Sequence, residues 1–215
     1  TVLREKVEGW IETDIGQFAQ TQYGISGKMN VNEDGYKIFR MGEVKNGLLV
    51  DTGKMKFINA DAETVEKYRL HHEDVLFNRT NSIDHVGKTG IFYGDGDYLF
   101  ASYLVRLKVD PSKINNRFLC YLMNSKAFLS NIRKKASKSV NQANINATIL
   151  RNELISYPKD IKTQKEIADK LSTLEDYTKD LEDILRQRLD ALRELKQSIL
   201  AKAFRGELTQ EEIAA

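Results

Sequence analysis

Cysteine, proline and long apolar runs are all scarce in this sequence. The single cysteine among 215 residues allows no internal disulfide framework, and Cys120 lies in an apolar helical pattern typical of a core thiol rather than a nucleophile. Two prolines, 41% hydrophobic residues and 30% charged residues indicate a folded chain rather than a disordered one. Because no apolar run reaches the roughly 18 residues of a membrane span, and the charged stretch Thr1 to Trp10 does not fit a signal peptide, we expect a cytoplasmic protein.

Acidic residues are missing from one long stretch, although the net charge is only +2. From Pro111 to Asn152 the chain has no acidic residue and eight basic ones, namely Lys113, Arg117, Lys126, Arg133, Lys134, Lys135, Lys138 and Arg151. Such a distribution is expected where phosphates bind and favours a nucleic acid as partner. The alternative is a solvated helix face.

A heptad repeat extends from Gln164 to Phe204 and predicts a coiled-coil helix. Thr163 to Glu166 fits a capping box at its start, and Gly206 suits the helix end. At about 1.5 Å per residue the helix is longer than the globule that the preceding residues can form, so we expect a partner helix to cover part of the seam. The expected seam and helix-partner residues are Ile167, Leu171, Leu174, Leu181, Leu185, Leu192, Leu195, Ile199 and Phe204.

The segment before this helix reads as a mixture of strands and helices. Strands are expected at 36–44, 48–50, 74–78, 86–93 and 98–109, and helices at 62–68, 116–133 and 147–155. The predicted class is α+β, with an irregular, glycine-punctuated sheet in a domain at 1–158 and a long helix at 159–215.

Catalytic and metal-binding patterns are weak. Gly87-Lys88-Thr89 lacks the glycine that a phosphate-binding loop needs at position 82, which is Ser, and His71, His72 and His85 lack any metal-ligand spacing. One alternative stays open, in which Asp34, Glu43 and Lys45 form the carboxylate–lysine set of a metal-dependent nuclease. We otherwise expect a binding protein with no catalytic residue, no metal and no cofactor of its own.

Two polar clusters fit DNA binding. Phe77 to Ser82 places amides, hydroxyls and a guanidinium at a strand end, and Lys134 to Asn144 combines cations for phosphates with amides suited to adenine edges. Any one of these residues can equally serve to cap a turn or a helix. The candidate DNA contacts are Lys28, Asn78, Arg79, Thr80, Asn81, Ser82, Lys88, Arg133, Lys134, Lys135, Lys138, Ser139, Asn141, Gln142 and Asn144.

The order of these features resembles one half of a type I restriction-modification specificity subunit. The similarity lies in Gly9-Trp10, in the segments 39–47, 73–82, 86–88, 100–104 and 141–146, and above all in the closing string Gln197 to Thr209. It covers almost the whole chain. One departure is that the proline-rich segment such proteins often carry before the long helix is reduced to Tyr157-Pro158 and the residues up to Gln164.

The resemblance implies a target-recognition domain that reads one half of a bipartite site on double-stranded DNA, followed by a spacer helix. It also implies docking of an adenine methyltransferase subunit that uses S-adenosylmethionine, and of an ATP-dependent restriction subunit. Because family members usually carry two such units and this chain has one, we expect an antiparallel homodimer and a palindromic site. The rival hypotheses are the nuclease named above and a purely structural coiled-coil adaptor.

Overall fold

A six-stranded sheet forms the centre of the first part of the chain, with strand order β2-β11-β7-β9-β5-β4. The computed structural model describes residues 8–140 and 142–207. The six strands are β2 (Ala19–Tyr23), β4 (Val44–Lys45), β5 (Leu48–Leu49), β7 (Val75–Asn78), β9 (Thr89–Ile91) and β11 (Leu104–Val109). β11 pairs antiparallel with both β2 and β7, so Val105 has Tyr23 on one side and Phe77 on the other.

Three smaller sheets surround this one. They are β1 (Trp10–Asp14) with β14 (Leu154–Pro158), β10 (Tyr98–Phe100) with β3 (Tyr36–Phe39) and β6 (Lys56–Ile58), and β12 (Ser137–Lys138) with β13 (Ala143–Asn144) and β8 (Thr80–Asn81). The single strand predicted over 98–109 is therefore two strands in two sheets. Likewise the strand predicted over 36–44 ends at Phe39, because Glu43 in the 3-10 helix η2 (Met41–Glu43) accepts a bond from the main-chain N–H of Arg40 at 2.8 Å.

The helices follow their capping residues. α1 (Ala62–Tyr68) has the predicted bounds, whereas the helix predicted over 116–133 is two helices, α2 (Asn116–Asn124) and α3 (Lys126–Lys134). Ser125 separates them, because its extended backbone and its side chain, which accepts from the N–H of Phe128, begin a new helix. α4 (Ala147–Arg151) is shorter than predicted, since the chain continues into β14, and a 3-10 helix η1 (Ile15–Gln17) follows β1.

The main apolar core lies between the six-stranded sheet and the helices α2 and α3. Phe77 and Val105 of the sheet are fully buried against Leu119 and Ile132 of these helices. Cys120 is also buried and donates its thiol to the carbonyl of Gly47 at 3.3 Å, which confirms the prediction of a core thiol. This core fixes β7 and α3, and the two polar clusters begin at the ends of these two elements.

The long helix α5 (Ile161–Phe204) begins three residues earlier than predicted. Asp160, not Thr163, accepts the hydrogen bonds at its start: the Asp160 carboxylate lies 2.9 Å from the Thr163 main-chain N and 2.8 Å from its hydroxyl oxygen. These bonds lower the pKa of Asp160 below its usual range, because they favour the charged form. The predicted capping box is therefore wrong, and an Asp cap replaces it.

Gln164 fixes the first turns of α5 to the preceding domain. Its side chain is fully buried, donates to the carbonyls of Pro158 at 2.8 Å and Lys113 at 3.0 Å, and accepts from the N–H of Asn115 at 2.8 Å. A buried amide satisfied in this way is costly to replace, because each of its partners would lose its own hydrogen bond. The compact unit Thr1–Ala168 accordingly includes this start of the helix.

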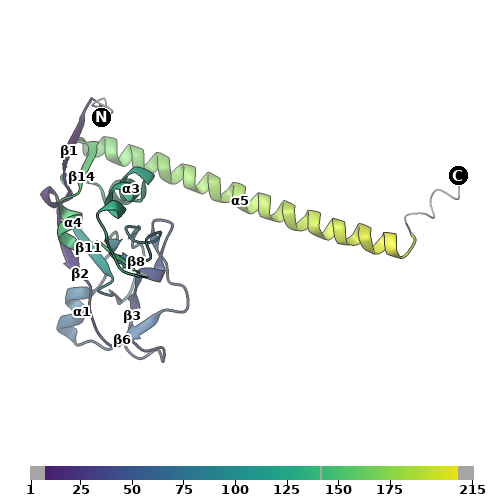
Figure 1. Ribbon diagram of the computed structural model, residues 1–215, viewed down its shortest axis with the longest axis horizontal. Helices are drawn as coiled ribbons and strands as arrows, with labels where there is room; N and C mark the ends of the chain where they lie inside the picture. The colour runs from purple at the N-terminus through teal and green to yellow at the C-terminus, as the bar shows by residue number, and fades with distance from the viewer. Residues whose placement is uncertain (1–7, 141, 208–215) are drawn as a thin grey trace. The chain divides into compact units, whose positions relative to one another are not determined.

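The second unit, Asp169–Ala215, contains the rest of α5, which Figure 1 draws as one uninterrupted helix. A helix of 44 residues is about 66 Å long at about 1.5 Å per residue. The helix ends at Phe204. Gly206 follows as predicted, and its φ of 74° places it in the left-handed region, where glycine is favoured. A mixed α and β domain followed by one long helix confirms the predicted α+β class. Across the described residues, no helix is long and apolar enough to cross a membrane.

Candidate nucleic-acid interface

The three-stranded sheet β12-β13-β8 contains residues from both polar clusters, which are far apart in the sequence. In it Thr80 pairs with Asn144 and Asn81 pairs with Ala143, while β12 pairs with the other edge of β13. The side-chain amide of Asn144 also donates to the hydroxyl of Thr80 at 3.0 Å. Residues from both clusters therefore belong to one small sheet, which the sequence did not indicate.

The connection between β12 and β13 is a hairpin turn. The main-chain N–H of Ser139 donates to the carbonyl of Gln142 at 2.8 Å, and the Ser139 hydroxyl donates to the same carbonyl at 3.2 Å. Val140 in this turn has 98% of its surface exposed, and the Gln142 side chain is exposed as well. Asn141 and the side chain of Lys138, both predicted DNA contacts, lie outside the described residues. A two-stranded ribbon of this kind has the size that the major groove of DNA admits.

Arg79 lies at the point where the chain leaves β7 and enters β8. One terminal nitrogen of its guanidinium donates to the carbonyl of Ser102 at 3.2 Å and the other donates to the side-chain oxygen of Asn144 at 3.1 Å. The guanidinium also lies over the ring of Tyr23, 4.9 Å from its centroid. These contacts are all internal to the domain, whereas the sequence predicted a guanidinium directed at DNA.

Arg133 likewise binds the protein's own backbone. Its guanidinium donates to the carbonyls of Asp84 at 2.7 Å and Val86 at 2.9 Å. It thereby holds the segment that follows β8, where Lys88 lies 3.0 Å from the ring nitrogen of His85. Both arginines predicted to contact DNA thus form hydrogen bonds within the protein, and DNA contact by either stays a prediction.

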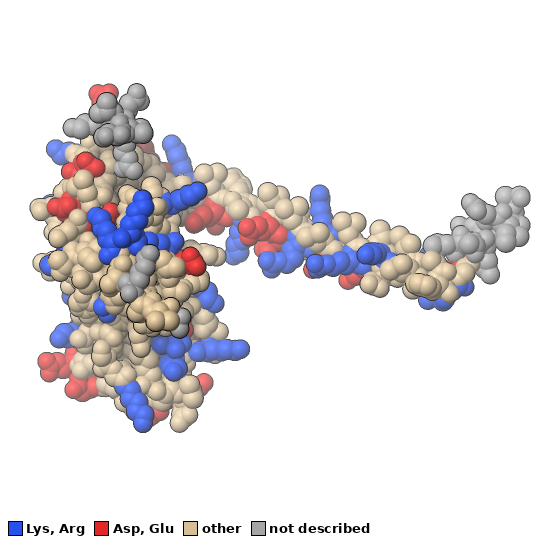
Figure 2. Space-filling view, in the orientation of Figure 1, with Lys and Arg blue, Asp and Glu red and all other residues tan. Residues whose placement is uncertain are grey.

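The basic cluster at the end of α3 carries less unpaired charge than the sequence suggested. Lys135 forms an ion pair of 2.7 Å with Glu153, whose side chain is only 5% exposed. Lys134 beside it is exposed, as are Lys126 at the start of α3 and Arg151 at the end of α4. Figure 2 shows blue Lys and Arg side chains gathered over the part of the domain where Figure 1 draws α3. Positive charge therefore lies beside the hairpin, which suits phosphate contacts.

Burial separates the remaining candidates. Asn78 is 1% exposed and donates to the carbonyl of Met41 at 3.4 Å, and Thr80 is 8% exposed, so neither side chain is placed to touch DNA in this conformation. Asn81 is half-buried and Ser82 is exposed next to it. Lys28 is exposed in the connection between β2 and β3, outside the three-stranded sheet. The exposed residues around the sheet include Ser82, Lys134, Lys135, Ser139, Val140 and Gln142.

The nuclease alternative finds no support in the described residues. Glu43 is 4% exposed and binds Arg40 through both its oxygens, and the Asp34 carboxylate accepts from the side chain of Asn59 at 2.8 Å. Across 8–140 and 142–207, no group of three His, Cys, Asp or Glu side chains is placed to hold a metal ion. Both carboxylates thus have structural partners: Glu43 stabilises a local turn with Arg40, and Asp34 binds Asn59, 25 residues along the chain.

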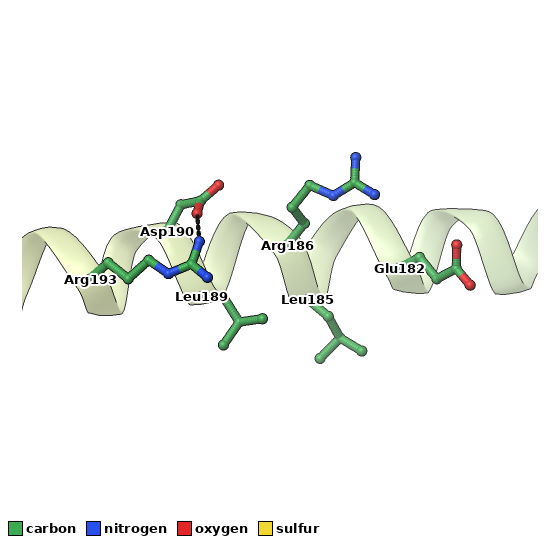
Figure 3. Close-up of a pocket in the computed structure, with 6 residues that line it drawn as sticks. All are labelled: Glu182, Leu185, Arg186, Leu189, Asp190 and Arg193. Atoms are coloured by element: carbon green, nitrogen blue, oxygen red, sulfur yellow. Dashed lines mark hydrogen bonds and ion pairs between the residues drawn. The ribbon is translucent and has the colours of Figure 1, made fainter.

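Most predicted seam residues of α5 are exposed. Leu174, Leu181, Leu185, Leu192 and Leu195 have between 50% and 61% of their surface exposed, and Phe204 has 90%. Ile167 differs, since it packs against the domain core. Figure 3 shows Leu185 and Leu189 directed to the same side of the helix, with Arg186 and Asp190 directed to the opposite side. The helix therefore presents an apolar side and a charged side, as the heptad pattern predicted.

Four residues around the interface were not among the predicted DNA contacts. Tyr23, Ser102, Glu153 and Val140 support or extend the hairpin surface, yet Tyr23 and Ser102 are distant in sequence from the residues they contact. Glu153 is the first acidic residue after the basic stretch, which was the one available hint that it neutralises a lysine there.

Known proteins match this chain over most of its length. A family model described as "Type I restriction modification DNA specificity domain" matches residues 8–191. The StySPI specificity subunit of Salmonella potsdam is 32% identical over 204 residues, a match that covers 94% of this chain and 44% of that protein. The EcoKI specificity subunit of Escherichia coli K12 is 27% identical over 189 residues, covering 86% of this chain and 40% of the relative. The chain thus spans less than half the length of these curated relatives.

Solved structures share the fold. The HsdS subunit from Thermoanaerobacter tengcongensis superposes with a TM-score of 0.62 at 21% identity, over 96% of this chain and 48% of that one. A chain from a structural study of complex assembly and conformational transition in the type I restriction-modification system gives a TM-score of 0.71 at 20% identity, with the same coverages of 96% and 48%. At such identities the likeness concerns the fold.

Proposed function

The chain belongs to the type I restriction-modification DNA specificity family, and we propose that its first unit reads one half of a bipartite site on double-stranded DNA. The observation that carries this proposal is the pairing of β8 with the β12–β13 hairpin, which places both polar clusters on one small sheet. The chain supplies recognition and no catalysis. Its role is to determine where other subunits act.

Two kinds of contact contribute to DNA binding on this surface. Exposed cations beside the hairpin, Lys134 foremost, attract phosphates and release counterions, which gives affinity without sequence preference. The exposed amide of Gln142 at the hairpin turn has the donor and acceptor pair that matches an adenine edge in the major groove. Sequence preference therefore comes from the hairpin and general affinity from α3.

The exposed apolar side of α5 supports pairing with a second helix of the same kind. Leucines that are half exposed or more recur from Leu174 to Leu195, along about six turns of helix, and are stabilised when a partner covers them. We propose that two copies of this chain pair through α5 as a closed, antiparallel dimer, with one recognition domain at each end. The DNA site then consists of two inverted half-sites.

Further subunits complete the assembly in this proposal. The apolar side of α5 is wider than a simple two-helix seam, because Tyr177, Ile184 and Leu189 are exposed beside it at 68%, 48% and 56%. This extra surface is the proposed docking site for a DNA adenine methyltransferase subunit, and an ATP-dependent restriction subunit joins the complete complex. S-adenosylmethionine and ATP are bound by those subunits. We place the assembly in the cytoplasm.

Selection from a random pool of DNA duplexes tests the recognition role. The chain should enrich one short motif, and its affinity for that motif should fall steeply with salt, as expected when several phosphates are neutralised. A structural coiled-coil adaptor would enrich nothing and show no salt-dependent binding. Enrichment of DNA without any common motif would limit the chain to nonspecific binding and contradict the recognition role.

A further inference from the structure

We infer that Arg79 positions the β12–β13 hairpin for reading DNA and does not itself read a base. This inference rests on the proposed recognition function of that hairpin. Arg79 occupies the single residue between β7 of the six-stranded sheet and β8 of the three-stranded sheet. The contacts that hold Arg79 in place therefore determine the angle between the two sheets.

The backbone of Arg79 bridges the two sheets. Its N–H donates to the carbonyl of Tyr103 at 3.0 Å, immediately before β11 of the six-stranded sheet. Its carbonyl accepts from the N–H of Ile145 at 2.9 Å, immediately after β13 of the hairpin. These bonds connect the start of β11 with the end of the hairpin.

The side chain of Arg79 repeats the same bridge one residue earlier on each side. Its guanidinium donates to the carbonyl of Ser102 and to the side-chain oxygen of Asn144, neighbours of Tyr103 and Ile145. The planar guanidinium suits this role, because its donors are fixed in one fork and can hold two acceptors at a set separation. Backbone and side chain thus connect the same pair of segments twice.

Further contacts extend this bridge into the domain. The ring of Tyr23 in β2 lies against the guanidinium, and the Tyr23 hydroxyl accepts from the N–H of Ala147 at 2.9 Å, at the start of α4. On the hairpin side, Asn144 donates to Thr80 of β8. The Nε of Arg79 is buried and has no hydrogen-bond partner among the described residues. The orientation of the guanidinium toward the domain follows from its bonds to Ser102 and Asn144 and from its contact with Tyr23.

The consequence for recognition differs from that of a base contact. A residue that reads one base determines the preference at that base, so its loss relaxes one position of the site. A residue that orients the whole hairpin acts on every base that the hairpin reads, so its loss lowers affinity and leaves the order of preference unchanged. The two roles are therefore separable by the pattern of preference.

The test compares Arg79→Ala with Asn144→Ala, the double variant, and Lys134→Ala as a control that also removes one positive charge. Each is measured in two ways: binding to the selected site and to its single-base substitutions, and hydrogen exchange of the β12 and β13 amides in the DNA-free chain. We expect Arg79→Ala and Asn144→Ala each to lower affinity for the site about tenfold, to keep the same preferred bases and to speed hairpin exchange. The double variant should lose little more affinity than the single variant with the larger loss, because both substitutions remove the same hydrogen bond between Arg79 and Asn144. Lys134→Ala should leave exchange unchanged.

Several results would overturn the inference. A changed preference at one position in Arg79→Ala, with unaltered exchange, would make Arg79 a base reader. Additive losses in the double variant, or weaker binding with unchanged exchange, would remove the positioning role. If Arg79→Ala does not fold, Asn144→Ala carries the test alone, because it removes the same bond from the hairpin side. If the unmodified chain selects no motif, the proposed function fails, while the exchange measurement still decides whether Arg79 holds the hairpin.

Discussion

The Lys135 ammonium nitrogen lies 2.7 Å from a carboxylate oxygen of Glu153, and the Glu153 side chain is almost entirely buried. Burial of a carboxylate is costly unless a cation compensates its charge. Lys135 therefore has a structural task. Its neighbour Lys134 is exposed as Lys135 is, but the ion pair with Glu153 is formed by Lys135. Adjacent lysines in one basic run thus have different surroundings, which makes them a matched pair for experiment.

Lys135→Ala should destabilise the fold, and Lys134→Ala should not. Loss of Lys135 leaves a buried charge with one partner fewer, which costs about 1–3 kcal/mol of unfolding free energy. Loss of Lys134 removes only an exposed charge and should change stability by less than about 0.5 kcal/mol. Urea unfolding of both variants measures the difference. Equal stabilities would show that water, not Lys135, compensates Glu153.

The same pair should differ in DNA binding. Lys134→Ala should weaken binding to all sequences and reduce the salt dependence by about one counterion, because an exposed lysine acts mainly through phosphates. Lys135→Ala should reduce the salt dependence less, since its charge is already balanced by Glu153. Salt titrations on cognate and random duplexes provide the slopes. A larger effect from Lys135 would mean that the ion pair opens on DNA.

Gln142→Ala should weaken binding to the cognate site selectively. The Gln142 main-chain carbonyl holds the hairpin turn through Ser139, and the substitution leaves that carbonyl in place. Only the exposed amide is lost, so the cognate complex should lose about 1–3 kcal/mol if the amide contacts a base, while binding to random DNA stays as it was. Competition binding with both duplexes measures this. Equal losses on both would remove Gln142 from base reading.

Replacing Leu181 and Leu185 with Asp should convert dimers to monomers. Both leucines lie in the exposed heptad seam, at 57% and 50% exposure, and a dimer would bury the new charges without partners. Arg186→Asp is the control, because this substitution introduces the same residue on the charged side of the helix. Arg186 points away from Leu185 in Figure 3. Light scattering reports the mass. A double variant that stays dimeric would place the interface elsewhere.

Local signals in the sequence identified elements, and non-local pairing decided how they combine. α1 has its predicted bounds because Asp61 caps it locally, accepting from the N–H of Thr64 at 2.8 Å. The heptads of α5 and the left-handed Gly206 were equally local. By contrast, the split of 98–109 into two strands depends on partners far along the chain, since β10 pairs with β3 and β11 pairs with β2 and β7. Periodicity holds no information about such partners.

The candidate site shows the same division. Residue types drew attention to Arg79, Lys135 and Asn144 as DNA contacts, but the contacts they make in the structure are with Ser102, Glu153 and Thr80. The bond between Asn144 and Thr80 joins residues 64 positions apart, so no local pattern could reveal it. A guanidinium that braces the backbone and one that reads a base look alike in a sequence. Only the placement of their acceptors separates them.

The cap of α5 should make the start of that helix sensitive to acid. Hydrogen bonds from Thr163 lower the pKa of Asp160, so its contribution to stability is present above the unfolded value of 3.8 and is lost as the pH falls through the lower folded value. Asp160→Ala should remove this contribution and flatten the pH dependence in that range. Asp169→Ala, an exposed site inside the helix, is the comparison. Unfolding measured at a series of acid pH values tests it, and identical pH profiles for the native chain and Asp160→Ala would contradict it.

The proposed antiparallel dimer would also determine the form of its DNA site. Two identical recognition domains at opposite ends of an antiparallel helix pair read the same bases on opposite strands, so the site should be an inverted repeat. A helix pair of fixed length also fixes the gap between half-sites, and two domains on one face of the duplex favour centres about one helical turn apart, roughly 10 bp.

A small change in the gap between the half-sites should have a large effect on methylation. One or two added base pairs rotate one half-site by roughly 35–70° about the duplex axis, which turns it away from its recognition domain while both half-sites stay intact. Methylation should therefore vanish on lengthened sites. Methylome sequencing of cells that carry this chain and its methyltransferase reads out both the motif and its gap. An asymmetric motif would instead mean that a different recognition domain occupies the second position, and tolerance of any gap length would show that the helix does not act as a rigid spacer.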